Sequence, residues 1–232
     1  MNIGLEKCKY YYEVLRSNML FKDVSRESIN RLLKISTAEF LPKHSNHIDG
    51  DRVLFKFHII ISGKLKIYNV NSEKNRQFIL FILKENEVFD TISLLDGIKH
   101  HMYYETLEDT EVLSIPVFKM RKWIGDNPNF NSALQKYVFK QMRLLETYTI
   151  DIALENVATR LAKLLMRHLN TSTNEIEFIN DLSHDELARL IGTTRAVLNR
   201  HIQDFKELGV LKVRRKNIKI TDLECLMGLA KM

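Results

Sequence analysis

Basic side chains are concentrated in one short segment of this 232-residue chain. Residues 194–219 contain eight lysines and arginines but only two acids, Asp204 and Glu207, so this window has a net charge of +6. Outside the window, 27 basic and 27 acidic residues balance. Such a local excess predicts binding to a polyanion, although a run of charge also fits a solvated surface. The basic residues are Arg195, Arg200, Lys206, Lys212, Arg214, Arg215, Lys216 and Lys219.

Motifs that carry enzymatic or metal chemistry are absent from the sequence. The two cysteines, Cys8 and Cys225, form no CxxC pair and cannot build a four-cysteine iron–sulfur cluster. The chain contains no GxGxxG, GxxxxGK[ST], HExxH or GxSxG motif, so we do not expect an enzyme. Five histidines lie within residues 44–101, and imidazole is a common ligand of metals and haem. Among these histidines, only His44-x-x-His47 and the pair at 100–101 have a spacing that suggests ligands of one metal or haem.

The basic window lies in a pattern typical of a helix-turn-helix. Ser183, with Glu186 three residues later, forms a capping box that predicts the start of a helix. Gly192 can adopt the left-handed conformation that ends a helix. One threonine of the pair 193–194 can cap a second helix, which Gly209 closes. We therefore expect two short helices joined by a tight turn.

A basic hairpin follows these helices. Residues 210–213 and 218–220 are predicted strands, joined by the turn 214–217 with the sequence Arg-Arg-Lys-Asn. Thr221 and Glu224 form a second capping box, so a short terminal helix should begin there.

The N-terminal half combines helices with short strands. Apolar residues recur near the helical period over residues 5–37, with Ser25 as a helix cap. From Phe40 onward, polar and apolar residues alternate, and turn residues separate the short segments. This pattern predicts an antiparallel barrel or sandwich. The expected strands are 53–61, 64–70, 76–83 and 111–115.

A long helix should begin at Asn127-Pro128, because Asn caps a helix and Pro is tolerated at its first position. Its apolar or neutral residues recur at steps of three and four, which is typical of a coiled-coil seam. The alternative is a helix packed on its own β domain. Residues 153–169 continue as a second helix, and 171–174 form a linker or turn. The seam residues are Leu134, Val138, Met142, Leu145, Thr149 and Ile152.

In this order, the segments resemble the CRP/FNR family of bacterial transcription regulators over nearly the whole chain. Residues 19–25 resemble the family's opening helix, and residues 59–68, IIISGKLKIY, resemble the strand–Ser-Gly–strand core of its cyclic-nucleotide-type β-roll. Residues 127–152 match its dimerisation helix. Residues 182–209 match its helix-turn-helix, especially Asp-Glu-Leu-Ala, Ile-Gly and Thr-Arg within that segment.

The resemblance implies an α+β fold in three parts. Residues 1–126 would form an N-terminal antiparallel β-roll of the double-stranded β-helix or jelly-roll type, which acts as the sensor. Residues 127–152 would form a long dimerisation helix, and 153–232 a C-terminal winged helix-turn-helix. The homodimer would read two half-sites of a palindromic operator about one helical turn apart, under control of an effector in the β-roll. RNA polymerase is a partner implied by the family.

The recognition helix should span residues 194–208 and contact base edges from its first turns. Arginine can bond guanine O6 and N7, and asparagine can bond adenine N6 and N7. The expected base contacts are Arg195, Ala196, Asn199 and Arg200. The expected phosphate contacts are Ser183, Thr194, His201, Arg214, Arg215 and Lys216. Many family members have glutamate in place of Ala196, so we expect a half-site different from the best-known ones.

The sensor departs from the family's cAMP-binding pattern. The positions of that pattern's Gly-Glu and Arg-Ser pairs are held here by Asp90-Thr91 and His100-His101, which form the candidate effector pocket. A carboxylate would repel a phosphate, and the arginine that would bind it is missing. We therefore expect no cAMP binding of the usual kind. An iron–sulfur cluster is excluded, whereas a haem-based gas or redox sensor, another small molecule, or a β-roll without a ligand stay open.

Two further expectations concern location and function class. No apolar run approaches the roughly 20 residues of a membrane helix, and residues 1–7 do not resemble a signal peptide. Together with the scarcity of cysteine, this predicts a cytoplasmic protein that does not enter a membrane. The competing class is a ligand-binding or interaction module that does not bind DNA. The concentrated positive charge favours double-stranded DNA as the partner.

Overall fold

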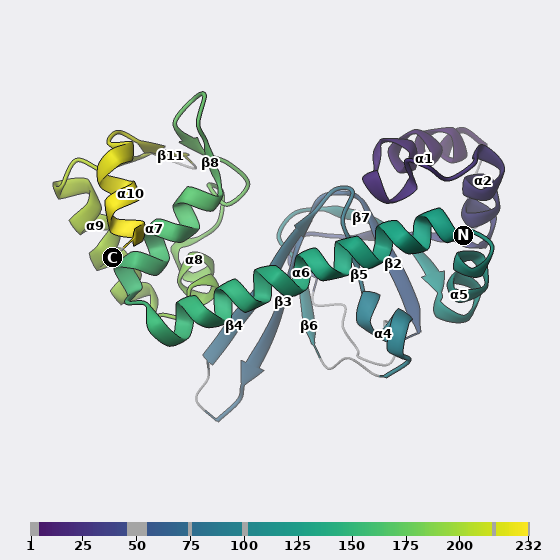
Figure 1. Cartoon of the computed structure of the whole chain (residues 1–232), viewed down its shortest axis with the longest axis horizontal. Coiled ribbons are helices and arrows are strands. Elements are labelled where there is room, and N and C mark those ends of the chain that lie inside the picture. Colours follow the sequence, from purple (N-terminus) through teal and green to yellow (C-terminus); the bar gives the residue numbers. More distant parts are fainter. Residues whose placement is uncertain (1–4, 46–54, 74–75, 99–101, 215–216, 232) are drawn as a thin grey trace. The chain divides into compact units, whose positions relative to one another are not determined.

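The computed structural model describes residues 5–45, 55–73, 76–98, 102–214 and 217–231 (Figure 1). Their contacts divide the chain into two compact units. Unit 1 comprises Met1–Asn69 and Leu80–Arg143, and unit 2 comprises Val70–Ile79 and Leu144–Met232. The long helix α6 (Pro128–Leu154) contributes residues to both. The fold is mixed α+β with antiparallel sheets, which confirms the predicted fold class.

The helical segment predicted over residues 5–37 is divided into three pieces by side-chain caps. The Asn18 side chain accepts a hydrogen bond from the amide of Leu20 (2.9 Å) and starts the short 3-10 turn. Ser25 accepts from the amide of Ser28 (3.1 Å), as its predicted role as a cap requires. The pieces are α1 (Leu5–Ser17), η1 (Met19–Phe21) and α2 (Arg26–Ile35).

Two antiparallel sheets form the β-roll, with strand orders β1-β7-β2-β5 and β4-β3-β6. Most of their residues belong to unit 1, whereas the end of β3 and the start of β4 fall within the segment Val70–Ile79 of unit 2. The predicted strands 64–70, 76–83 and 111–115 are present within about one residue. Strand β2 begins at Lys56, and residues 46–54 lie outside the described part of the chain. The strands are β1 (Thr37–Leu41), β2 (Lys56–Ser62), β3 (Lys64–Asn71), β4 (Arg76–Lys84), β5 (Val88–Phe89), β6 (Tyr103–Thr106) and β7 (Thr110–Pro116).

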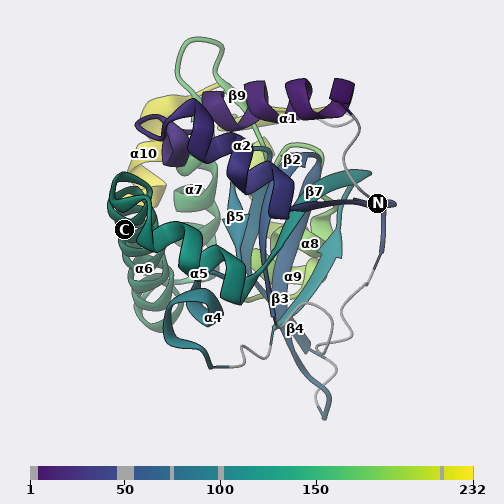
Figure 2. The same ribbon diagram turned by 90° about the vertical axis from the view of Figure 1, so that its right-hand side faces the viewer.

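Strand β2 is buried on both faces, which explains its uninterrupted apolar run. On one face, Phe57, Ile59 and Ile61 belong to a core shared with the helices, including α5 (Val117–Gly125) and the start of α6. On the other face, Ile60 joins a second core built from strands of both sheets. Figure 2 shows α2 and α5 beside the β2–β7 strands. The short helix α4 (Thr91–Asp96) follows β5.

Helix α6 begins at Pro128, as predicted, and ends at Leu154. The next helix, α7 (Val157–Arg167), begins four residues later than expected, because the Asn156 side chain accepts a hydrogen bond from the amide of Thr159 (2.9 Å) and caps it. In the described part of the chain, no helix is both long and apolar enough to cross a membrane.

The C-terminal part of unit 2 is a winged helix-turn-helix. A four-stranded sheet of order β10-β11-β9-β8 accompanies the helices, and the predicted turn at 171–174 connects β8 to β9. The elements are β8 (Leu169–Asn170), β9 (Glu175–Ile176), α8 (His184–Leu190), α9 (Arg195–Glu207), β10 (Leu211–Arg214), β11 (Asn217–Ile220) and α10 (Leu223–Lys231).

Candidate nucleic-acid interface and sensor site

Local capping interactions fix the two helices of the helix-turn-helix. The Ser183 hydroxyl accepts from the amide of Glu186 (3.2 Å), and the Glu186 carboxylate accepts from the amide of Ser183 (2.9 Å). This is the predicted capping box, and it starts α8. Thr194 accepts from the amide of Val197 (3.4 Å) and starts α9. Between the helices, Gly192 has a φ of +65°, which glycine adopts without steric cost.

Helix α9 has a buried face and an exposed basic face. Leu198, Ile202 and Phe205 are buried in the core of unit 2. The spacing i, i+1, i+4 and i+5 brings the predicted base-contacting residues to the opposite, exposed side of the helix. These residues are Arg195, Ala196, Asn199 and Arg200.

A hydrogen bond that sequence reasoning missed connects the two helices at this surface. His184, the first residue of α8, has its Nδ1 2.6 Å from Oδ1 of Asn199 on α9. The two residues are 15 positions apart. The capping box indicated where α8 begins, but no spacing rule indicated that the first side chain of α8 would contact α9.

The predicted phosphate contacts have different environments. The hydroxyls of Ser183 and Thr194 are engaged in caps. His201 has its Nδ1 3.2 Å from the Asp204 carboxylate, and its side chain is only 19% exposed. Arg214 is exposed at the end of β10, whereas Arg215 and Lys216 lie outside the described residues.

The β10–β11 hairpin places two lysines opposite each other. Lys212 and Lys219 are cross-strand partners, and both are exposed. Like charges in this arrangement destabilise a sheet, since adjacent strands bring them close together. On its other side, Lys219 is the cross-strand partner of Glu175 of β9, so one acid lies beside Lys219. The two lysines give this side of the hairpin an excess of positive charge.

Comparisons with known proteins agree with this architecture. A family model described as a cyclic nucleotide-binding domain matches residues 44–127, and one described as a Crp-like helix-turn-helix domain matches residues 159–229. A CRP-like cAMP-activated global transcriptional regulator of Mycobacterium tuberculosis is 25% identical over 224 residues, which cover 94% of this chain and 99% of that protein. The chain belongs to the CRP/FNR family of transcription regulators.

Other members of the CRP/FNR family match over much of their length. The global nitrogen regulator of Nostoc is 25% identical over 171 residues, covering 71% of this chain and 76% of that protein. A CooA mutant from Carboxydothermus hydrogenoformans has the same fold, with a TM-score of 0.78 at 22% identity, and the match covers 92% and 95% of the two chains. FixK2 from Bradyrhizobium japonicum has a TM-score of 0.72 at 18% identity, over 84% and 97%.

Asp90 and Thr91 are the described residues of the predicted effector pocket. Asp90 precedes α4 with a φ of +61°, and its buried carboxylate accepts a hydrogen bond from the Tyr104 hydroxyl. Thr91 is half-buried, and His100 and His101 lie outside the described residues. Among the described residues of this predicted pocket, Asp90 and Thr91 thus supply a carboxylate and a hydroxyl but no cation, and a carboxylate would repel the phosphate of a cyclic nucleotide.

Buried polar side chains lie next to Asp90 inside the roll. Oδ2 of Asp90 and Nε2 of His58 are 3.8 Å apart, and neither atom has a hydrogen-bond partner among the described residues. The other ring nitrogen of His58, Nδ1, is 2.8 Å from Oγ of Ser114. Ser114 is also hydrogen-bonded to Glu39, which pairs with Lys56 at 2.7 Å. A carboxylate only accepts, so the Ser114 hydroxyl donates to Glu39 and in turn accepts from His58.

Burial determines the protonation of these side chains. It raises the pKa of Asp90 to about 7, against the hydrogen bond from Tyr104, which lowers it. It also lowers the pKa of His58 to about 4. The Ser114 side chain is 1% exposed, so the Ser–His–Asp arrangement offers no accessible nucleophile. Among the described residues, no three His, Cys, Asp or Glu side chains gather as a metal site.

The predicted seam of α6 is partly buried within unit 1. Leu134 is fully buried in the core shared with α1, α2 and α5, so it lies against its own protomer. Val138 and Leu145 are half-buried, whereas Met142, Thr149 and Ile152 are exposed. Phe139 and Ile150, outside the predicted seam, are also exposed, at 59% and 56%.

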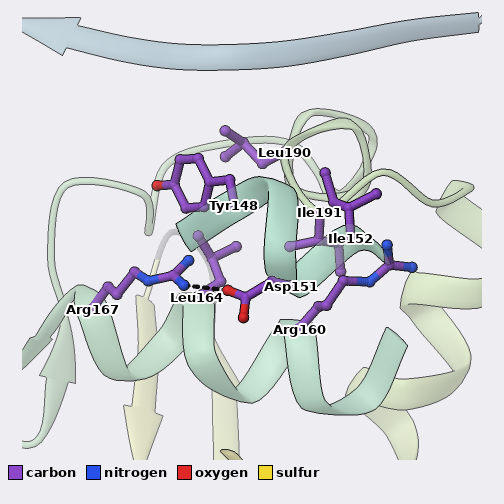
Figure 3. Close-up of a pocket in the computed structure, with 8 residues that line it drawn as sticks. All are labelled: Tyr148, Asp151, Ile152, Arg160, Leu164, Arg167, Leu190 and Ile191. Atoms are coloured by element: carbon purple, nitrogen blue, oxygen red, sulfur yellow. Dashed lines mark hydrogen bonds and ion pairs between the residues drawn. The ribbon is translucent and has the colours of Figure 1, made fainter. Parts of the chain in front are cut away.

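A shallow pocket in unit 2 lies where α6, α7 and α8 meet (Figure 3). Asp151 of α6 is buried and forms ion pairs with Lys163 (2.9 Å) and Arg167 of α7. Burial would raise the pKa of Asp151, but hydrogen bonds from these two cations bring it below its ordinary value. The Arg167 guanidinium also lies 4.7 Å from the ring centroid of Tyr148. These contacts hold α6 and α7 together across the break at Asn156.

We predict that Asp90→Asn removes a pH dependence from the stability of unit 1. The folded state favours protonated Asp90, so this contribution is present below about pH 4 and is lost as the pH rises through about 7. The variant should match the wild type near pH 4 and be more stable at pH 8, by up to about 4 kcal/mol. Thermal unfolding from pH 4 to 8.5 measures the difference, and parallel profiles would contradict the prediction.

Asp151→Asn should destabilise unit 2, because it leaves Lys163 and Arg167 without their shared acceptor. Both cations are about one-quarter exposed, so we expect a loss of about 1–3 kcal/mol rather than the 3–5 of a fully buried pair. Urea unfolding measures the effect. Glu146→Gln, which removes an exposed carboxylate of the same helix, is the control and should change the stability by less than about 0.5 kcal/mol. Equal effects of the two changes would refute the role of Asp151.

Proposed function

We propose that this member of the CRP/FNR family is a homodimeric, sequence-specific regulator that reads a palindromic operator with α9. The observation that supports this most is the exposed set Arg195, Asn199 and Arg200 on a helix within the +6 window. In the proposed division, residues 1–126 sense an effector, 127–152 form the dimer helix and 153–232 bind DNA. The protein would work in the cytoplasm, where the DNA is, with RNA polymerase as a further partner.

The proposed contacts fall into two classes. Arg195, Ala196, Asn199 and Arg200 would face base edges, where each good bidentate pair discriminates by about 1–3 kcal/mol. Ser183, Thr194, His201, Arg214, Arg215 and Lys216 would contact phosphates and set the register. Lys212 and Lys219 of the hairpin join this second class, because bound phosphate would relieve their mutual repulsion. With Ala196 unable to accept from cytosine, the half-site would differ from those read by relatives with glutamate there.

The effector is proposed to be something other than cAMP bound in the usual manner. Asp90, which we expect at the phosphate pocket, has a buried carboxylate that accepts a hydrogen bond from Tyr104. The relatives themselves differ in this respect: by their names one is cAMP-activated, and a regulator from Xanthomonas campestris is c-di-GMP responsive. A β-roll of this kind therefore does not by itself specify which ligand it binds.

Two substitutions separate base contacts from phosphate contacts. Arg200→Ala should reduce discrimination at one operator position by about 1–3 kcal/mol. Arg214→Ala should weaken binding to all sequences and reduce the slope of log Kd against log salt by about 1. Fluorescence anisotropy over a series of salt concentrations measures both.

Lys34→Ala, which removes an exposed lysine of α2 in unit 1, is the control and should change neither quantity. Wild-type protein whose DNA affinity is independent of salt would instead support an interaction module that does not bind DNA.

Dimerisation should depend on the exposed part of the α6 seam. Met142→Glu would place a charge in an apolar interface twice, once from each protomer, and should weaken self-association by roughly 100-fold or more. Sedimentation equilibrium measures the association, and circular dichroism checks the fold. Lys136→Glu is the control, because this exposed residue lies on the opposite side of α6 from the seam. A monomeric wild-type protein would contradict the dimer model.

A further inference from the structure

The contact between His184 and Asn199 joins an exposed side chain, proposed above to read a base, to the capped start of α8. His184 is the first residue of α8, and the capping box of Ser183 and Glu186 fixes the backbone on which it stands. Its imidazole is half-buried, whereas Asn199 is exposed. The separation of 2.6 Å between Nδ1 and Oδ1 is that of a hydrogen bond.

The polarity of this hydrogen bond determines how the amide is oriented. A carbonyl oxygen can only accept, so Nδ1 of His184 is the donor. The Asn199 amide is thereby held with Oδ1 toward α8, and its Nδ2 hydrogens are left for another partner. Without such a contact, an exposed asparagine can rotate its amide by half a turn and exchange donor for acceptor.

The orientation of the amide bears directly on base choice. In the major groove, cytosine presents only its N4 donor at the base edge, whereas purines present N7 and thymine presents O4 as acceptors. An Asn199 whose Nδ2 is available as a donor favours the bases with acceptors and disfavours cytosine. An amide turned the other way accepts a hydrogen bond and tolerates cytosine.

We propose that His184 is a positioning residue that selects against cytosine at the operator base facing Asn199, by fixing the sense of the Asn199 amide. This inference rests on the proposed function, since it requires α9 to read DNA. His184 itself need not touch a base. Its role is to restrict the rotation of the Asn199 amide, which contacts the base.

Two substitutions of His184 test which side chain donates in the hydrogen bond with Asn199, because they place a donor or an acceptor close to the position of Nδ1. The Nδ1 atom of histidine is attached to Cγ, in the same place as one terminal atom of Asn or Asp. His184→Asn can keep a donor at this place, whereas His184→Asp can only accept there. Both residues are also tolerated in the first turn of a helix, and Asp is favoured there. Circular dichroism checks that both variants fold.

The experiment measures the affinity of each variant for operators that differ at one position of the half-site. Asn199→Ala first identifies the position that Asn199 reads, as the one where discrimination disappears. There the wild type should disfavour cytosine by about 5- to 150-fold, the ratio that corresponds to about 1–3 kcal/mol. His184→Asn should keep most of this ratio, His184→Ala should bring it close to one, and His184→Asp should shift it in favour of cytosine.

A double-mutant comparison separates positioning from a direct phosphate contact. If His184 acts through Asn199, changes at 184 in the Asn199→Ala background should leave the base ratios unaltered. The inference is overturned if His184→Ala and His184→Asp weaken binding to every sequence equally, or change a position where Asn199→Ala has no effect. In either case the proposed function stands. A wild-type protein that shows no base preference overturns both the inference about His184 and the proposed sequence-specific function.

Discussion

The left-handed turn at Gly192 is the constraint on which the geometry of the helix-turn-helix depends. It joins the end of α8 to the cap of α9 with a φ of +65°, a conformation that side chains with a β-carbon rarely adopt. A β-carbon added there would lie 3.8 Å from atoms of Arg160 and Ile152, which is ordinary contact distance. The backbone angle, rather than crowding, therefore favours glycine. The turn allows Leu198 and Ile202 to pack inward while the first turns of α9 present arginine and asparagine to solvent.

The net positive charge of the chain is concentrated in the same segment as this exposed surface. The residues outside the window balance in charge, so the positive potential arises where α9 and the β10–β11 hairpin lie in sequence. Lys212 and Lys219 lie opposite each other on adjacent strands, with Glu175 beside Lys219, and under the proposed function a phosphate near them would offset their mutual repulsion. In unit 1 the opposite principle applies. Asp90 and His58 are buried there, and burial shifts the pKa of each toward its neutral form.

Much of this organisation was predictable from sequence, because it depends on local interactions. Ser183–Glu186 and Ser25 indicated helix starts that the structure confirms, and Asn127-Pro128 located the start of α6. Short strands such as β5 and β6 escaped prediction, since two to four residues carry no periodicity and are held by pairing with distant strands. The contacts of Asp90 with Tyr104 and of His184 with Asn199 could not be predicted either, because these residues are distant in sequence and meet only in the folded chain.

In the proposed function, two copies of α9 read one symmetric DNA site. Hydroxyl-radical footprinting of the purified protein, on a DNA fragment that it selects from a random pool, is a direct test of this arrangement. We predict two protected patches on one face of the duplex, centred about 10–10.5 base pairs apart and related by two-fold symmetry in the selected sequence. A single asymmetric patch, or equal protection of unselected DNA, would contradict symmetric reading by a dimer.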